Sequence, residues 1–71
     1  MRDEDLIRMA NQIAANFEGY PADEARAGLL DHLRKFWDPR MRAQFTAMAA
    51  AQQAALHPMA AAIVGELRQP A

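Results

Sequence analysis

Large hydrophobic side chains recur every three or four residues along most of the chain, which is the spacing of one face of an α-helix. Between residues 4 and 18 they form a single stripe, made of Leu6, Met9, Ala10, Ile13 and Phe17. Between residues 22 and 37 a second stripe covers an arc of roughly 120°, the width of a core-facing helix surface. Its members are Phe36, Leu29, Leu33, Trp37 and Leu30. The pattern predicts two amphipathic helices.

The second half of the chain continues this spacing with fewer large side chains. A third helix is predicted from Pro39 to about Leu56, with a stripe of Met41, Phe45, Met48 and Leu56 and with Gln52 in line. A short last helix carries Met59, Ile63 and Leu67 before the chain frays at "RQPA". No stretch alternates as a strand does. We therefore expect an all-α fold, a small single domain spanning residues 1–71 with three to four short helices joined by Gly/Pro turns.

Three proline-containing dipeptides and tripeptides separate the predicted helices. "GYP" at 19–21 ends the first, "DP" at 38–39 restarts the chain as the third, and "HP" at 57–58 starts the last. Proline fits the first helical turn because no N–H is needed there. Asp38 is expected to cap the third helix, and His57 is expected to act as a cap or to face solvent.

The composition shows that the core is thin. The chain has 71 residues and no cysteine, so disulfides and zinc-thiolate or iron–sulfur ligation by thiolates are excluded. Seventeen residues are alanine, and nineteen large apolar side chains remain when Met1 is set aside. A single core in a chain below about 70–80 residues seldom supplies more than roughly 3–5 kcal/mol. A partner subunit is the expected additional support.

The charge pattern excludes several classes of function. A formal net charge of −1 argues against a general binder of nucleic acid or of anionic membranes. The acidic start "MRDEDLIRMA" lacks the layout of a signal peptide, and the longest uncharged stretch, residues 43–65, is interrupted by glutamines, His57 and Pro58. We expect a cytoplasmic protein, for which the absence of cysteine is also suitable.

No catalytic or cofactor-binding pattern is present. The sequence contains neither a glycine-rich phosphate loop nor an HExxH motif, and it has three glycines in all. His32 and His57 are far apart, and neither has a carboxylate three or four residues later. We therefore expect no catalytic residue, no metal ligand and no cofactor in this chain.

The stretch "HLRKFWDPRMR" at 32–42 contains two adjacent aromatics and four of the eight basic residues. Phe36 is predicted to face the core, whereas Trp37, at the edge of its stripe, is either a core-edge residue or the occupant of a partner's pocket. Arg42 could pair with Asp38, four residues before it. Arg40 stands at the end of a helix that disfavours a cation and has no such explanation. Tryptophan and arginine are frequent at interface hot spots, so Trp37, Arg40 and Arg42 are the expected partner-binding residues.

Two stretches, "LIRMANQIAANF" at 6–17 and "HLRKFWDPRMR" at 32–42, together resemble the delta subunit of the soluble, NAD-dependent, molybdenum-containing formate dehydrogenases. The resemblance covers roughly the first 45 residues and includes the order of the stretches and the proline-containing turn. It implies a small accessory subunit that is itself not an enzyme and that supports assembly, molybdenum cofactor insertion or stability. It supplies no catalytic residues.

The same resemblance implies partners and cofactors for the complex. The catalytic alpha subunit of the family holds a molybdenum bis-pterin guanine dinucleotide and iron–sulfur clusters. The beta and gamma subunits carry FMN, the NAD site and further clusters. The alpha subunit within an alpha-beta-gamma-delta complex is thus the expected partner. Whether the delta subunit stays bound or acts only during maturation is left open.

A small helix-turn-helix regulator of DNA is the alternative interpretation. The second predicted helix, a short turn and a third helix that begins with Arg40 and Arg42 resemble the layout of a recognition helix. Residues 43–56 argue against it, because they offer alanines and glutamines but no positive charge for phosphates.

Overall fold

The computed structural model describes residues 1–69, which form five α-helices and one 3₁₀ turn and contain no strand. The helices are α1 (Asp3–Asn16), α2 (Ala22–Phe36), α3 (Pro39–Met48), α4 (Pro58–Ala62) and α5 (Val64–Arg68), and the 3₁₀ turn is Gln53–Ala55. The predicted all-α class is confirmed. No helix within these residues has the length and apolar character needed to cross a membrane.

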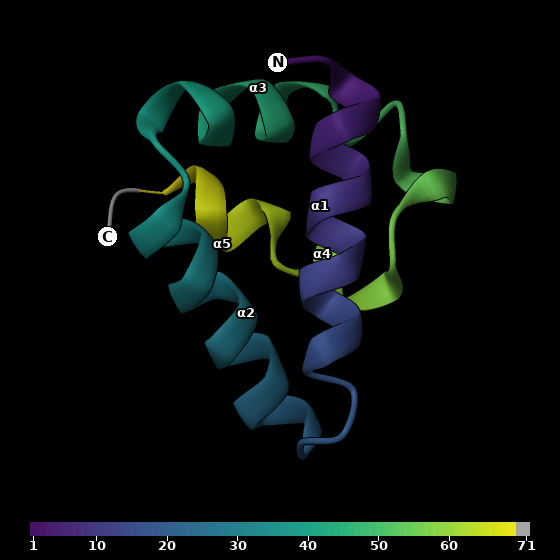
Figure 1. Ribbon diagram of the computed structural model, residues 1–71, viewed down its shortest axis with the longest axis vertical. Coiled ribbons are helices and arrows are strands. Elements are labelled where there is room, and N and C mark those ends of the chain that lie inside the picture. Colours follow the sequence, from purple (N-terminus) through teal and green to yellow (C-terminus); the bar gives the residue numbers. More distant parts are fainter. Residues whose placement is uncertain (70–71) are drawn as a thin grey trace.

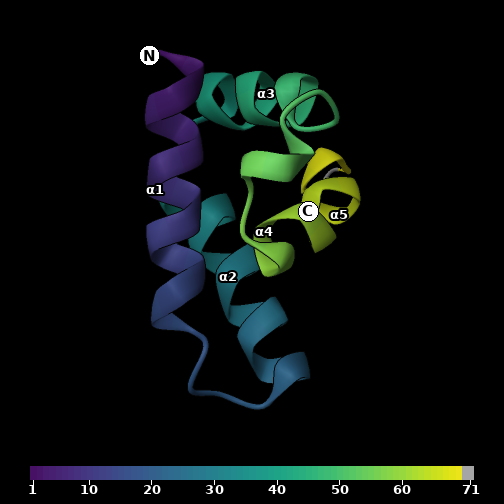
Figure 2. The same cartoon turned by 90° about the vertical axis from the view of Figure 1, so that its right-hand side faces the viewer.

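The first two helices are antiparallel and diverge from the turn that joins them, so that they form a V (Figure 1). α3 lies across the open end of this V. The short helices α4 and α5 pack behind α1 and α2, as the side view shows (Figure 2). The smallest dimension of the fold is 17 Å, which is enough for two layers of helices packed at the usual axial distance of about 8–10 Å.

The core fills the space between these two layers. Its largest fully buried side chains come from α1, α2, α3 and the junction between α4 and α5: Phe45, Leu6, Leu29, Leu33 and Ile63. Alanines of α1 are buried at Ala10 and Ala14, where a small side chain lets the neighbouring helices approach closely. The helices can therefore pack at short range at these positions.

Two of the predicted helix boundaries are wrong. The third helix was expected to reach Leu56, but α3 ends at Met48 and residues 49–52 form turns that lead into the 3₁₀ turn. Only alanines and glutamines follow Met48 up to Ala55, so no large side chain holds a longer helix against the core. The predicted last helix is interrupted at Ile63, which separates α4 from α5. Arg68 was predicted to lie in the fraying end of the chain, but it is the last residue of α5.

Candidate partner-binding site

The corner between α2 and α3 is built by a sharp change of backbone conformation at Trp37. α2 ends at Phe36, and Trp37 is extended, with φ −91° and ψ 133°. The Asp38 carboxylate then accepts a hydrogen bond from the backbone N–H of Met41 at 2.8 Å, and Pro39 occupies the first position of α3. The predicted cap at Asp38 and the restart at "DP" are both confirmed.

This corner gives the two adjacent aromatics opposite environments. Trp37 is 4% exposed and packs edge-on against Phe45, with ring centroids 5.4 Å apart. Phe36 is 71% exposed, so its predicted core position is wrong. The helical pattern of α2 does not extend to Trp37, and the extended backbone there directs the indole toward Phe45. Of the two alternatives for Trp37, a core-edge residue or the occupant of a partner's pocket, the structure shows the core position.

The two arginines of α3 differ in their contacts. Arg42 is half-buried and donates through Nη1 to the backbone carbonyl of Arg34 at 2.7 Å. No ion pair joins it to Asp38 within the described residues. Arg40 is exposed and makes no hydrogen bond or ion pair with residues 1–69. The partner-binding assignment of Trp37, Arg40 and Arg42 stays a prediction. Of the three, Arg40 is the residue whose side chain makes no polar contact within residues 1–69.

Two further arginines connect α5 to the other helices through contacts that were not predicted. Arg34 donates to the carbonyl of Glu66 at 2.8 Å. Arg68 donates to the carbonyl of Thr46 at 2.8 Å. Both contacts join residues more than twenty positions apart, and no local spacing predicts them.

The seam between α3 and α5 is a groove of about 580 Å³, which we call the arginine groove. Its lining residues are Pro39, Arg42, Ala43, Thr46, Ala47, Leu67, Arg68 and Gln69. Ala43 and Ala47 are exposed and small, and they leave room above the helix. The groove thus combines a small-residue and apolar wall with two guanidinium groups and has no carboxylate in its lining.

A second surface lies on the opposite side of the corner, where α1 and α2 diverge. A Cβ atom at Gly28 would lie 2.5 Å from Cε1 of Phe17, so the Phe17 ring packs directly on the backbone of α2. One and two turns toward the open end, α2 presents His32 and Phe36, whose rings are tilted by 42° to one another with centroids 4.7 Å apart. The corresponding turns of α1 carry the half-buried Ile13 and Met9.

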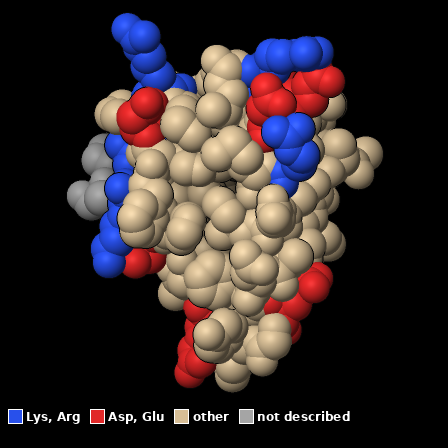
Figure 3. All heavy atoms as spheres, in the orientation of Figure 1, with Lys and Arg blue, Asp and Glu red and all other residues tan. Residues whose placement is uncertain are grey.

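We call this surface the apolar face, made of Met9, Ile13, Phe17, His32 and Phe36. The space-filling view shows a broad uncharged region over α1 and α2, with charged side chains around its margin (Figure 3). Phe36 is the largest exposed aromatic on it. Exposing a phenylalanine does not stabilise a monomer. Burying such a side chain, in contrast, stabilises the protein by about 25 cal/mol per Å² of apolar surface removed from water.

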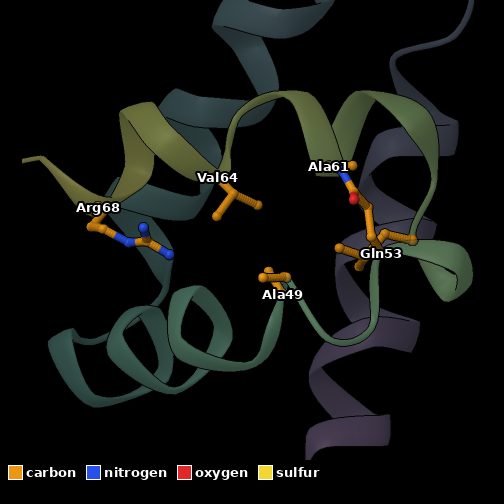
Figure 4. Close-up of a pocket in the computed structure, with 7 residues that line it drawn as sticks. Ala49, Gln53, Ala61, Val64 and Arg68 are labelled. Atoms are coloured by element: carbon orange, nitrogen blue, oxygen red, sulfur yellow. The ribbon is translucent and has the colours of Figure 1, made fainter.

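A smaller recess lies between the end of α3 and the last two helices. Its volume is about 230 Å³, and Ala49 and Val64 face one another across it while the Arg68 side chain closes one end (Figure 4). Ligand sites for small molecules are usually about 300–1,000 Å³. The recess is below that range, and its walls are mainly the side chains of alanine, leucine and valine.

His57 connects the start of α4 to the end of α1. Its Nδ1 accepts a hydrogen bond from the backbone N–H of Met59 at 3.1 Å, which confirms the predicted cap. Its Nε2 lies 2.7 Å from a carboxylate oxygen of Glu18. The backbone N–H of His57 donates to the side-chain oxygen of Asn11 at 2.7 Å. His57 therefore has a structural role at this position. Within residues 1–69 no three His, Asp or Glu side chains lie together as a metal site would require.

The geometry of α3 does not favour the helix-turn-helix alternative. This helix has ten residues, and Arg42 at its start is turned back onto the carbonyl of Arg34. Arg40 is then the one fully exposed cation of α3, since Arg42 is half-buried. A recognition helix relies on several such contacts.

Comparison with known families gives one match. The family model described as NADH-dependent formate dehydrogenase delta subunit FdsD matches residues 5–64. The match continues through the alanine-rich segment, past the first 45 residues that carried the resemblance. No curated protein and no solved structure matches the chain.

Proposed function

The chain belongs to the family of NADH-dependent formate dehydrogenase delta subunits, and we propose that it is a non-catalytic accessory subunit of that enzyme. In this proposal it binds the catalytic alpha subunit within an alpha-beta-gamma-delta complex in the cytoplasm. Its role is to support assembly, insertion of the molybdenum cofactor or stability of the alpha subunit. The molybdenum bis-pterin guanine dinucleotide, the iron–sulfur clusters, FMN and NAD are then carried by the other subunits.

The exposure of Phe36 on the apolar face is the observation that supports this role. Phe36 is exposed beside the half-buried His32, and the neighbouring helix α1 carries the half-buried Met9 and Ile13, so this surface resembles the centre of a protein interface. Such centres are depleted in charge and enriched in aromatic residues and methionine. Contact with a larger subunit would bury Phe36 without any change in the packing of the five helices.

The test uses the whole complex in its native host. A strain without the gene for this chain is complemented with tagged wild-type, Phe36→Ala or Lys35→Ala chains. Lys35 is the neighbour of Phe36 and is exposed, but its side chain pairs with Asp31 at 3.2 Å on another side of α2, so it serves as the control. The measurements are recovery of the alpha subunit with the tag, molybdenum content of the purified enzyme, and formate-dependent reduction of NAD.

We expect Phe36→Ala to reduce recovery of the alpha subunit by about tenfold or more, because truncation of a hot-spot aromatic commonly has an effect of this size. Lys35→Ala should behave as wild type. Molybdenum content should fall with Phe36→Ala if the chain acts in cofactor insertion, and only the lifetime of the activity should fall if it acts in stability. Normal recovery of the alpha subunit with Phe36→Ala would show that the apolar face is not the docking surface.

A further inference from the structure

The charges of this chain are divided between two regions of the molecule. Six of the eight basic residues and three of the nine acidic ones lie on α2 from Arg26 onward, on α3 with its cap, and on α5. This region has an excess of three positive charges. The remainder, α1 and the start of α2, has an excess of four negative charges, which together give the net charge of −1.

Most acids of the positive region already have a partner or a structural role. Glu66 pairs with Arg26, and Asp31 pairs with Lys35. Asp38 caps α3. Four arginines in this region, within the part of the chain that the structure describes, have no carboxylate partner. They are Arg34, Arg40, Arg42 and Arg68.

The arginine groove brings two of these four arginines to one concave surface. Arg42 and Arg68 each make one hydrogen bond to a backbone carbonyl. A guanidinium has five N–H donors, so each keeps further donors for another group. The neighbouring recess, between α2 and α5, is different: Arg26 and Arg34 share it with Asp23, Asp31 and Glu66. The arginines of that recess are thus balanced by carboxylates in the same lining, whereas the arginines of the arginine groove are not.

We propose that the arginine groove binds an acidic segment of another subunit of the formate dehydrogenase complex, with its carboxylates on Arg42 and Arg68. The proposal rests on the proposed function, since it assumes that the chain is a subunit. Charge complementarity supports it, because a carboxylate accepts two parallel hydrogen bonds from a guanidinium. The small side chains of Ala43 and Ala47 give the partner's backbone room to approach, and Arg40 lies one turn before Ala43 on the exposed side of α3.

Two other polyanionic or acidic occupants fit less well. A nucleic acid would place a continuous run of phosphates across the region, next to the carboxylates of Asp38 and Glu66. A second copy of this chain could dock through the acidic start of α1 only where Glu4 already pairs with Arg2 and Asp5 with Arg8, or through Asp23 and Glu24 in the first turn of α2. Both remain outcomes of the test.

The test places a charge of either sign in the groove at Ala43, which is exposed and lies in the middle of α3. The probe is the formate dehydrogenase purified from a strain that lacks this chain, and the full-length chain is titrated onto it. Ala43→Glu should weaken binding by about tenfold or more through like-charge repulsion. Ala43→Lys, of similar size, should bind as well as wild type or more tightly. Arg68→Gln should weaken binding, and Arg8→Gln, on the acidic side, should not.

Salt gives an independent measurement on the wild-type chain. A rise in salt from about 0.1 M to about 1 M shortens the Debye length from roughly 10 Å to roughly 3 Å and should weaken binding by at least about tenfold. Circular dichroism of each variant checks that the helices are retained. Equal weakening by Ala43→Glu and Ala43→Lys, or none by either, would overturn the acidic occupant.

The remaining outcomes separate this proposal from the proposed function. If Phe36→Ala abolishes binding and neither Ala43 variant changes it, the subunit role stands and the arginine groove is excluded. If the wild-type chain does not bind the probe, the subunit role fails and the groove proposal fails with it. Salt-sensitive dimers of the free chain in sedimentation, or a gel shift with DNA that Ala43→Glu abolishes, would replace the acidic subunit by a second copy or by nucleic acid.

Discussion

At the scale of one residue, a single change of backbone conformation between Phe36 and Trp37 leaves one aromatic exposed and the other buried. On a continuous helix Phe36 would lie near the middle of the apolar arc and Trp37 at its edge. Because α2 ends at Phe36, the extended backbone of Trp37 turns its indole into the core, where Phe45 receives it. The hydrophobic pattern identified both aromatics as important but could not assign them. For Trp37 it assumes a helix that has already ended, and for Phe36, the last residue of α2, it does not show that α1 diverges from α2 at this end (Figure 1).

The two residues should therefore differ in their contribution to stability. Trp37→Ala removes a buried aromatic and should cost about 3–5 kcal/mol, most of the stability that a domain of this size has. Phe36→Ala should change the free energy of unfolding by no more than about 0.5 kcal/mol, because the ring is exposed. Urea unfolding followed by circular dichroism measures both. A large loss of stability in Phe36→Ala would contradict the exposed position.

At the scale of the element, the helix starts were predictable and one helix end was not. "DP" and "HP" place a proline in the first turn and a capping side chain before it, and both caps form as expected at Asp38 and His57. The end of α3 carries no comparable signal, since alanine is a strong helix former and the sequence from 49 onward contains no glycine or proline until Pro58. The helix ends at Met48 because the alanines and glutamines that follow include no large side chain to hold a longer helix against the core.

The Asp38 cap should have a measurable energy. Asp38→Ala removes the acceptor for the Met41 N–H and should cost about 1 kcal/mol, whereas Asp38→Asn keeps an acceptor and should cost less than half of that. Asp31→Ala is the control, because it removes an exposed carboxylate whose pairing with Lys35 contributes about 0.3–0.5 kcal/mol. Thermal unfolding of the three variants gives the comparison. Equal losses for Asp38→Ala and Asp38→Asn would exclude the capping role.

Two glycines inside helices should respond in opposite ways to alanine. A Cβ at Gly65 in α5 meets nothing within 4 Å, so Gly65→Ala should stabilise the chain by about 0.5–1 kcal/mol through helix propensity. A Cβ at Gly28 in α2 meets the Phe17 ring at 2.5 Å, so Gly28→Ala must displace that ring and should lose this gain. Unfolding midpoints in urea distinguish them. A gain at Gly28 equal to that at Gly65 would show that Phe17 moves freely.

At the scale of the whole molecule, the contacts that orient α5 could not be predicted from the sequence. Arg34 reaches Glu66 and Arg68 reaches Thr46 across the fold, and both bonds end on backbone carbonyls, which every residue has. The charge count gave a net value near zero and could not show that positive and negative charges separate in space. The predicted partner-binding residues stay a prediction, and the two candidate surfaces, the apolar face and the arginine groove, lie on either side of their corner.

The core of the whole molecule is smaller than the composition suggests. Among the described residues, fourteen hydrophobic side chains are buried and five of them are alanine. Nine large side chains then remain for the interior, while Phe36, Tyr20 and Met1 are exposed. The stability of the isolated chain should be low for the same reason, and a subunit that covers an exposed surface would add to it.

This argument predicts the thermal behaviour of the chain alone and in its complex. The isolated chain should unfold in a broad transition no higher than the range of about 45–65 °C that is usual for ordinary domains. A partner present at about 100 times its Kd adds about 2.7 kcal/mol to the folded state. Since 1 kcal/mol shifts the midpoint of a small domain by roughly 4–8 °C, the chain should unfold roughly 10–20 °C higher in the complex. Differential scanning calorimetry of both preparations measures the shift. A sharp transition of the dilute free chain above about 80 °C, outside that usual range, would show that nine large buried side chains suffice and that no partner is needed for its stability.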